Sequence, residues 1–167
     1  MKFYKRLLIK LGSLTNGRIR VALYRKAGMK IGSNVRIASG IHVDRPEGVI
    51  IGDNCFINHF VHFHNGANHE TTISIGNNVF LGPEVTFICA THEIGDHYRR
   101  AGKNKYGSIN VEDGAWIGAS TTILPGVRIS QGGVIGAGAV VTKSTDPDAL
   151  YYGVPARKIR ELELNVK

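Results

Sequence analysis

The sequence predicts an all-β solenoid, a parallel β-helix whose triangular coils are built from six-residue repeats. An aliphatic residue followed by a small or turn-forming residue recurs every six positions over most of the stretch from Ile31 to Val141. Glycine is abundant and aromatic residues are few, with 21 Gly and 8% aromatic residues in 167. A period of six matches neither the helical period of about 3.6 nor simple strand alternation. Three such repeats make one triangular coil, so the aliphatic side chains stack inside a narrow prism.

The repeat predicts the core directly. Its leading aliphatic positions are Ile31, Ile37, Val43, Ile51, Ile57, Phe63, Ile75, Leu81, Phe87, Val111, Ile117, Ile123, Ile129, Ile135 and Val141. A second set of core positions lies four residues later, at Val35, Ile41, Cys55, Val61, Val79, Val85, Ala115, Thr121, Val127 and Ala139. Each flat face is expected to pair with the coils above and below as a parallel ladder. The corners must turn sharply, which predicts positive φ at corner glycines such as Gly52 and at Asn pairs such as Asn77-Asn78.

The length suits one domain, which we divide into an N-terminal helical segment (1–29), the solenoid (30–145) and a C-terminal tail (146–167) with a short helix. Two cysteines do not indicate a disulfide framework. Cys55 is expected in the core, and Cys89 lies close to the candidate site without an obvious base partner. The sequence contains neither a signal-peptide pattern nor an apolar run that could span a bilayer, which favours a cytoplasmic location.

The N-terminal segment is strongly basic. Ten Lys and Arg residues and not one acidic residue lie between Met1 and Val43. Apolar residues at helical spacing, namely Phe3, Leu7, Leu8, Leu11 and Leu14, predict an amphipathic helix. Such a helix could cover the open end of the solenoid, or lie on the anionic inner face of a membrane, and the two roles are compatible. Nucleic-acid binding is not supported, because the segment has no recognised motif and no interleaved aromatic residues.

The repeat is interrupted once with a functional implication. Continued past Phe87, it would place Glu93, Arg99 and Lys105 inside the prism, where unpaired charges are not tolerated. Residues 93–108 are therefore expected to leave the coil as a polar, flexible loop, with His92 at its root. A long loop on a rigid scaffold usually carries function.

Several motifs around and after this interruption resemble one family. They are Ala90-Thr91-His92, the segment VEDGAWIG at 111–118, Ile123-Leu124-Pro125-Gly126-Val127, VIGAGAVVTK at 134–143 and GVPARKIR at 153–160. Together they are similar to the hexapeptide-repeat acyltransferases with a left-handed parallel β-helix, and within them to the galactoside, maltose and capsular-sugar O-acetyltransferases. The N-terminal region of the maltose-type enzymes, which helps to define the acceptor site, is replaced here by the basic segment.

The resemblance implies an acetyl-CoA-dependent transfer to a sugar hydroxyl, without an acyl-enzyme and without a metal, in surface-polysaccharide or glycan modification. It also implies a homotrimer with each active site between neighbouring subunits. His92 would be the general base, a role that suits a residue type that titrates near neutral pH. Asn58 and Trp116 would contact substrate. The implied CoA-binding residues are Ala119, Gly136, Ala137, Thr142, Lys143, Arg157 and Arg160, the arginines because guanidinium groups suit phosphates.

Other interpretations remain open. Asn58 could be a structural corner residue, Trp116 could pack at an interface, and an amino-sugar acceptor would make the reaction an N-acetylation. His69 lies in a string similar to the segment before the active-site loop of xenobiotic acetyltransferases. The clustered histidines at 59, 62, 64, 69, 92 and 97 raise a γ-carbonic-anhydrase-like metal enzyme. A non-catalytic solenoid is the remaining alternative.

Overall fold

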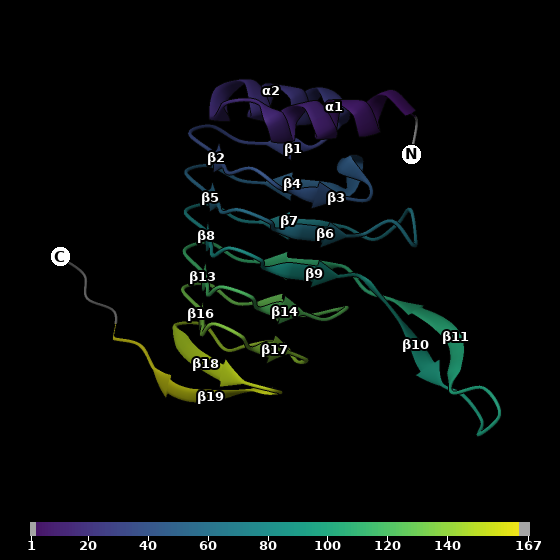
Figure 1. Ribbon diagram of the computed structural model, residues 1–167. Helices are drawn as coiled ribbons and strands as arrows, with labels where there is room; N and C mark the ends of the chain where they lie inside the picture. The colour runs from purple at the N-terminus through teal and green to yellow at the C-terminus, as the bar shows by residue number, and fades with distance from the viewer. Residues whose placement is uncertain (1–2, 164–167) are drawn as a thin grey trace.

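The structure, a computed structural model, describes residues 3–163 as a stack of triangular β-coils with two helices across one end (Figure 1). The first sheet of the prism contains β1 (Lys30–Ile31), β4 (Val49–Ile51), β7 (Ile73–Ile75), β12 (Ile109–Val111) and β15 (Arg128–Ile129). The second contains β2 (Arg36–Ile37), β5 (Phe56–Ile57), β8 (Phe80–Leu81), β13 (Trp116–Ile117), β16 (Val134–Ile135), β18 (Ala149–Gly153) and β19 (Ala156–Glu161). The third contains β3 (His42–Val43), β6 (His62–His64), β9 (Thr86–Ile88), β14 (Thr122–Ile123) and β17 (Val140–Val141). The parallel β-helix predicted from the repeat is confirmed.

The core follows the six-residue repeat. Every predicted core position is buried except Ile31 and Val35, which lie in the first coil and are half-buried. Equivalent positions of successive coils carry similar residues, which stack on one another. The parallel rings of Phe63 and Phe87 are an example, with centroids 5.3 Å apart. Stacked identical positions explain why a period of six was readable in the sequence.

The corner glycines and the corner asparagines have different roles from those expected. Gly52 is needed for close approach, because a Cβ there would lie 2.7 Å from the carbonyl oxygen of Gly76 in the next coil. Positive φ falls two residues later, at Asn34 (52°), Asn54 (57°) and Asn78 (56°). The expectation of positive φ was therefore correct for the Asn pairs and wrong for the glycine that precedes them.

Two helices, α1 (Phe3–Leu14) and α2 (Gly17–Ala27), cover the first coil. They cross where Gly12 faces the ring of buried Tyr24, since a Cβ at Gly12 would lie 2.5 Å from that ring. The guanidinium group of buried Arg20 joins both helices to the solenoid, donating to the carbonyl oxygens of Gly12 at 2.9 Å and Ile37 at 2.7 Å. Neither helix among the described residues has the length and apolar character needed to cross a bilayer.

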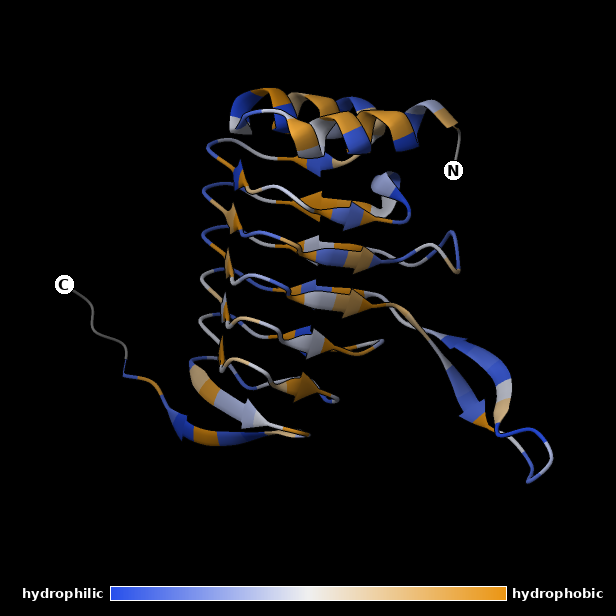
Figure 2. Cartoon of the chain, viewed as in Figure 1, coloured by the Kyte–Doolittle hydropathy of each residue, from blue (hydrophilic) through white to orange (hydrophobic). Residues whose placement is uncertain are grey.

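The interruption of the repeat forms a β-hairpin rather than a loop. Strand β10 (Ala90–Ile94) pairs antiparallel with β11 (Ala101–Tyr106), and the hairpin projects from the side of the solenoid (Figure 1). Figure 2 shows that it is mostly hydrophilic. The predicted departure from the coil is confirmed, but it begins at Ala90 and not at Glu93, because paired backbone groups extend the two strands back to the root.

The predicted C-terminal helix is wrong within the described residues. Strands β18 and β19 form an antiparallel hairpin instead, and β18 continues the second sheet by pairing with β16. The aromatic residues Tyr151 and Tyr152 suit a strand, and Gly153 turns the chain at φ 97°. The outer side of β16 is thus paired with β18, the sixth strand of the sheet counted from β2, and β19 forms the edge. Another short element, η1 (Pro46–Gly48), is a 3-10 turn between β3 and β4.

Candidate active site

His92 lies on β10 beside an irregularity in the hairpin. It is paired with Asn104, whereas Ile94 is paired with Ala101, so the register shifts between the two pairs. A bulge of this kind re-aims the side chains around it and is common next to active sites. The hairpin therefore holds His92 on rigid, paired backbone rather than on a mobile loop.

The hydrogen bond of His92 determines which ring nitrogen is available. Its Nδ1 lies 3.1 Å from the carbonyl oxygen of Gly102, on the opposite strand. A carbonyl oxygen can only accept, so Nδ1 carries the proton and donates it. In the neutral ring Nε2 is then unprotonated and can accept a proton from a substrate.

A groove of about 560 Å³ runs between the hairpin and the solenoid at His92. Hairpin residues on both sides of His92 and the corner after β14 line it, together with Thr142 after β17. The hairpin root packs tightly on that corner, because a Cβ at Gly107 would lie 2.4 Å from the backbone nitrogen of Gly126. Within one chain, the structure therefore brings together His92 and Thr142, two of the predicted site residues.

A second groove, of about 770 Å³, follows the second sheet on a different edge of the prism. Five predicted residues line it, namely Trp116, Ala119, Gly136, Ala137 and Arg160. Trp116 is 54% exposed, Ala137 is exposed, and Ala119 and Gly136 are half-buried. The structure thus brings these five residues together along one groove.

Three predicted residues line neither groove. Asn58 is half-buried at the corner after β5, and its Oδ1 accepts a hydrogen bond from the backbone nitrogen of His59 at 2.8 Å. Lys143 is exposed beyond β17, and Arg157 is exposed on β19, where it donates to the neighbouring carbonyl oxygen of Ala156 at 3.0 Å. Within a single chain none of the three lines the groove at His92.

The rival catalytic residues have different surroundings. His69 is exposed in the turn between β6 and β7. His97 is exposed at the hairpin tip, with its ring centroid 3.8 Å from that of Tyr98. Cys89 is buried, and burial raises the pKa of its thiol to about 11, which leaves it a poor nucleophile.

Sequence reasoning missed the residues that shape the second groove. Phe80 is stacked in register with Trp116, and Tyr152 packs over Gly136, where a Cβ would lie 2.3 Å from the Tyr152 ring. The signal for Phe80 was present, since it precedes a core aliphatic residue as Trp116 does and therefore faces outward. Tyr152 could not be found from the repeat, because the C-terminal strand lies outside it.

Comparison with known proteins places the chain among hexapeptide-repeat proteins. The family model for the hexapeptide repeat of succinyl-transferase matches residues 108–143. The galactoside O-acetyltransferase of Escherichia coli (strain K12) is 32% identical over 143 residues, which cover 86% of this chain and 68% of that protein. A maltose O-acetyltransferase from Clostridium difficile 630 superposes with a TM-score of 0.80 at 30% identity, covering 96% of this chain and 85% of the other. A hexapeptide-repeat acetyltransferase from Vibrio cholerae O1 biovar eltor, solved with acetyl-coenzyme A, gives a TM-score of 0.82 at 32% identity, with coverage of 96% and 88%.

The chain therefore belongs to the hexapeptide-repeat acyltransferase family with a left-handed β-helix, near its galactoside and maltose O-acetyltransferases. The resemblance read from the C-terminal motifs is confirmed. The chain spans 50% of the length of a Schizosaccharomyces pombe relative and 62% of that of the Lactococcus lactis galactoside O-acetyltransferase.

Proposed function

We propose that this protein is an acetyl-CoA-dependent O-acetyltransferase that transfers an acetyl group to a sugar hydroxyl, in surface-polysaccharide or glycan modification. The observation that carries the proposal is the His92–Gly102 hydrogen bond, which leaves Nε2 free at the wall of a groove. The relatives support the same chemistry, since two are galactoside and maltose O-acetyltransferases and one was solved with acetyl-coenzyme A.

His92 acts as the general base. Its Nε2 takes the proton of the sugar hydroxyl while the hydroxyl oxygen forms a bond to the acetyl carbonyl carbon. Acetyl-CoA supplies the acetyl group as a thioester, and the C–S bond breaks as the ester forms. The protonated imidazole then returns its proton to the departing thiolate, so the products are the acetylated sugar and CoA. A positioned base of this kind contributes about 10²- to 10⁴-fold to the rate.

The second groove is proposed to hold the CoA part of the donor. Ala119, Gly136 and Ala137 carry no long side chain, so an extended pantetheine arm can lie along this part of the groove. Arg160 lines the same groove and offers a guanidinium fork to phosphate. Thr142 and Lys143 are proposed at the nucleotide end with Arg157, although these three do not line this groove in one chain.

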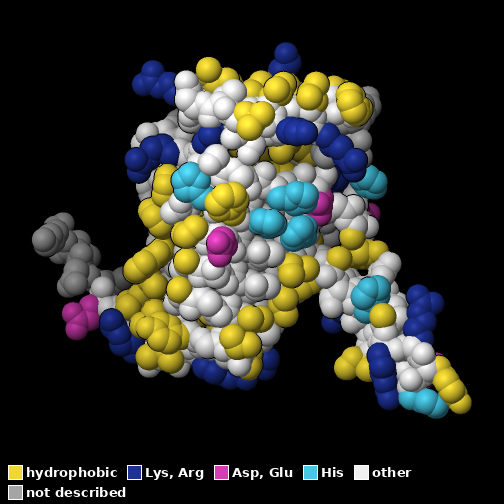
Figure 3. Space-filling model, viewed as in Figure 1, with side chains coloured by type: hydrophobic (Ala, Val, Ile, Leu, Met, Phe, Trp, Pro, Cys, Tyr) yellow, Lys and Arg dark blue, Asp and Glu magenta, His cyan; other side chains and the backbone are white. Residues whose placement is uncertain are grey.

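A homotrimer would bring the two grooves together. They lie on different edges of the same prism, so a ring of three copies can place the His92 edge of one protomer against the Trp116 edge of the next. The Trp116 edge carries an outward apolar ladder, with Phe56 and Phe80 ring centroids 5.0 Å apart and Phe80 paired with Trp116. Figure 3 shows hydrophobic side chains gathered along one edge of the solenoid. The closed ring would also bring Asn58 to the acceptor.

The alternative acceptors use the same site. An amino sugar in place of the hydroxyl would make the reaction an N-acetylation, with His92 taking a proton from the attacking amine. The exposed position of His69, away from the groove lining, favours His92 over the arrangement of xenobiotic acetyltransferases. A γ-carbonic-anhydrase-like centre, with three histidines at a subunit interface, is disfavoured for His92 and His97, since His97 lies between the two strands of the projecting hairpin and not within a continuing coil.

We also propose that α1 contacts an anionic membrane surface, at the cytoplasmic leaflet. Its stripe of Phe3, Leu7, Leu11 and Leu14 faces solvent, while Ile9 and Gly12 face the helix pair and the solenoid. Figure 3 shows hydrophobic side chains along the helical layer with Lys and Arg beside them. Capping and membrane contact thus use opposite faces of one helix.

The test is free-thiol release from acetyl-CoA across a panel of mono- and oligosaccharides, with mass spectrometry of the sugar product. A sugar that gains one acetyl group, with one thiol released per acetyl, supports the proposal. Thiol release that never exceeds the rate without acceptor, over a panel containing galactosides, maltose and amino sugars, contradicts it.

A further inference from the structure

A compact group of histidine and aspartate side chains lies on the outer face of the third sheet. None of its members lines either of the two grooves described above. Residues two apart on a strand point to the same face, so His42 and Asp44 project outward together, as do His62 and His64 on the next coil. The parallel register places His42 directly over His62. Asp44 is held above His64 by the bond from its backbone nitrogen to the carbonyl oxygen of Phe63, at 3.2 Å. The four side chains form a two-by-two array, visible as the histidine cluster in Figure 3.

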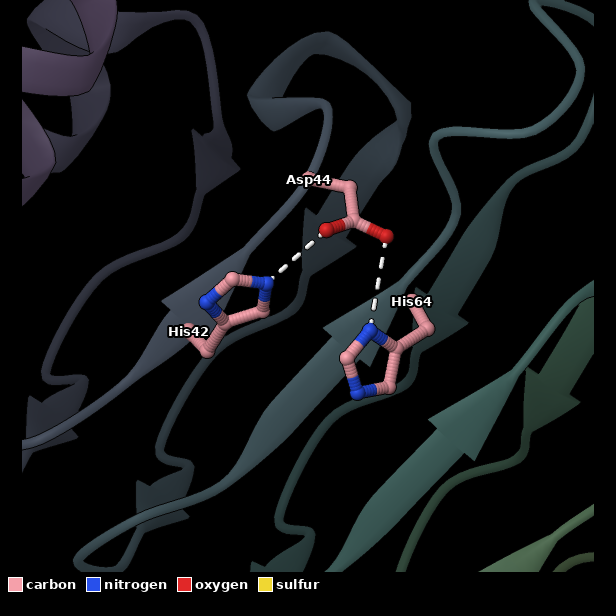
Figure 4. Close-up of side chains that lie close together, drawn as sticks. All are labelled: His42, Asp44 and His64. Carbon is pink, nitrogen blue, oxygen red and sulfur yellow. Dashed lines mark hydrogen bonds and ion pairs between the residues drawn. The ribbon is translucent and has the colours of Figure 1, made fainter.

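The carboxylate of Asp44 lies between two imidazoles (Figure 4). Its Oδ1 is 2.8 Å from His42 Nε2, and its Oδ2 is 3.4 Å from His64 Nδ1. The three ligand atoms of His42, Asp44 and His64 all lie within 4.8 Å of one another. Ligand atoms bound tetrahedrally at about 2.0–2.1 Å from a zinc ion are about 3.3 Å apart, so small side-chain rotations suffice to surround a cation here.

The backbone under this group is rigid. Val43 and Phe63, which separate the paired side chains along each strand, are buried in the core. Gly66 packs against the aspartate, since a Cβ there would lie 2.7 Å from the Cβ of Asp44. The buried residues of both strands and the close contact between Gly66 and Asp44 fix the positions of the ligand side chains. A metal site needs this kind of support.

We propose that His42, Asp44 and His64 bind a divalent transition-metal ion, with Zn²⁺ as the reference ion. Two imidazoles and one carboxylate suit zinc and its neighbours rather than Mg²⁺ or Ca²⁺, which take oxygen ligands. The side chains of His42 and His64 are 52% and 40% exposed, so an ion can enter from solvent. His62 is the nearest further imidazole, with its ring centroid 5.7 Å from that of His42 and 5.6 Å from that of His64. Water or a ligand oxygen can occupy the remaining position.

Surface ion pairs alone do not account for the group. An exposed carboxylate–imidazole pair contributes about 0–1 kcal/mol to stability, so the two contacts of Asp44 add little to the fold. A bound cation would use one nitrogen of each of His42 and His64 and one carboxylate oxygen of Asp44. The proposal does not depend on acetyl transfer, so it can fail or succeed independently of the enzymatic function.

The experiment is equilibrium dialysis of the untagged protein against ZnCl₂ at pH 7.5, with zinc measured by mass spectrometry. Co²⁺ substitution reports the geometry through its visible absorption. We expect one zinc per chain and a tetrahedral Co²⁺ spectrum. His42→Ala, His64→Ala and the isosteric Asp44→Asn should each weaken binding by about 100-fold or more, because loss of an outer contact to a zinc ligand already costs about 10- to 100-fold.

The matched control is His69→Ala, which removes an exposed histidine outside the array and should leave zinc binding unchanged. Circular dichroism of each variant confirms the fold, which exposed substitutions should preserve. Wild-type protein that binds no zinc overturns the proposal. So does zinc that persists in the His42 and His64 variants but is lost in His97→Ala, since that result places the ion at the hairpin.

Discussion

The Nδ1 of His92 and the carbonyl oxygen of Gly102 are 3.1 Å apart across the two strands of the projecting hairpin. This contact couples the tautomer of the proposed base to the pairing of β10 with β11. The strand that returns to the solenoid would therefore act on the proposed base through this carbonyl oxygen.

Displacing that carbonyl oxygen should slow the reaction. A Cβ at position 102 would lie 2.9 Å from the carbonyl oxygen of Glu93, so Gly102→Val must shift the strand. A misplacement of about 1 Å can cost about 100-fold in rate. We expect kcat to fall by about 10- to 100-fold, with KM for acetyl-CoA little changed. Gly17→Ala is the control, because a Cβ there meets nothing within 4 Å. An unchanged kcat in Gly102→Val would separate the hairpin strand from the base.

Arg160 should recognise the phosphates of the donor. A hydrogen bond to a charged group contributes about 1.5–3 kcal/mol, so Arg160→Ala should raise KM for acetyl-CoA by about 10- to 100-fold. The same variant should handle S-acetyl-pantetheine as well as the wild type does, because that donor lacks the nucleotide phosphates. Arg18→Ala, on α2, serves as the charge-matched control. Equal losses with both donors would assign Arg160 a structural role in β19.

The two buried cysteines should be inert in the folded protein. Burial raises the pKa of the Cys89 thiol to about 11, so about 0.1% is thiolate at pH 8. Burial also raises the pKa of the Cys55 thiol. Iodoacetamide at pH 8 should leave the intact mass unchanged until denaturant is added, and Cys89→Ala should retain activity. Rapid alkylation of native protein with parallel loss of activity would point instead to a thiol mechanism.

The six-residue repeat predicted most of the fold. Stacked coils place similar residues above one another, and this periodicity is visible in a single sequence. The resemblance of the C-terminal motifs, and not the repeat, supplied Trp116, Ala119, Gly136, Ala137 and Arg160, which line one groove. The C-terminal hairpin escaped prediction because β18 joins the second sheet through a strand outside the six-residue repeat. The tautomer of His92 could not be predicted either, because it depends on the register of β10 and β11. A loop, and not a pair of strands, was expected there.

The exposed stripe of α1 should bind anionic vesicles. Basic residues near such a surface contribute about 1 kcal/mol each, and the contribution falls with salt. We expect co-flotation with phosphatidylglycerol vesicles but not with phosphatidylcholine vesicles. Leu7→Glu with Leu11→Glu should abolish it, because both side chains face solvent. Val154→Glu changes an exposed apolar residue elsewhere and should have no effect. Flotation that is unaltered in the Leu7/Leu11 variant would rule out α1 as the contact.

The assembly should contain three chains. Phe80→Glu places a charge in the outward apolar ladder next to Trp116, so it should weaken association. Light scattering coupled to size-exclusion chromatography should report three chain masses for the wild type and a lower mass for the variant. A wild type that elutes as one chain at working concentration would leave the two grooves on separate edges and contradict the assembled site.

The most direct measurement is single-turnover acetyl transfer by the wild type and His92→Ala, at saturating acetyl-CoA and the best acceptor of the panel. Removal of a positioned base predicts a fall in the rate constant of about 10²- to 10⁴-fold, with donor binding retained. Equal rate constants for the two proteins would contradict the assignment of His92 as the base.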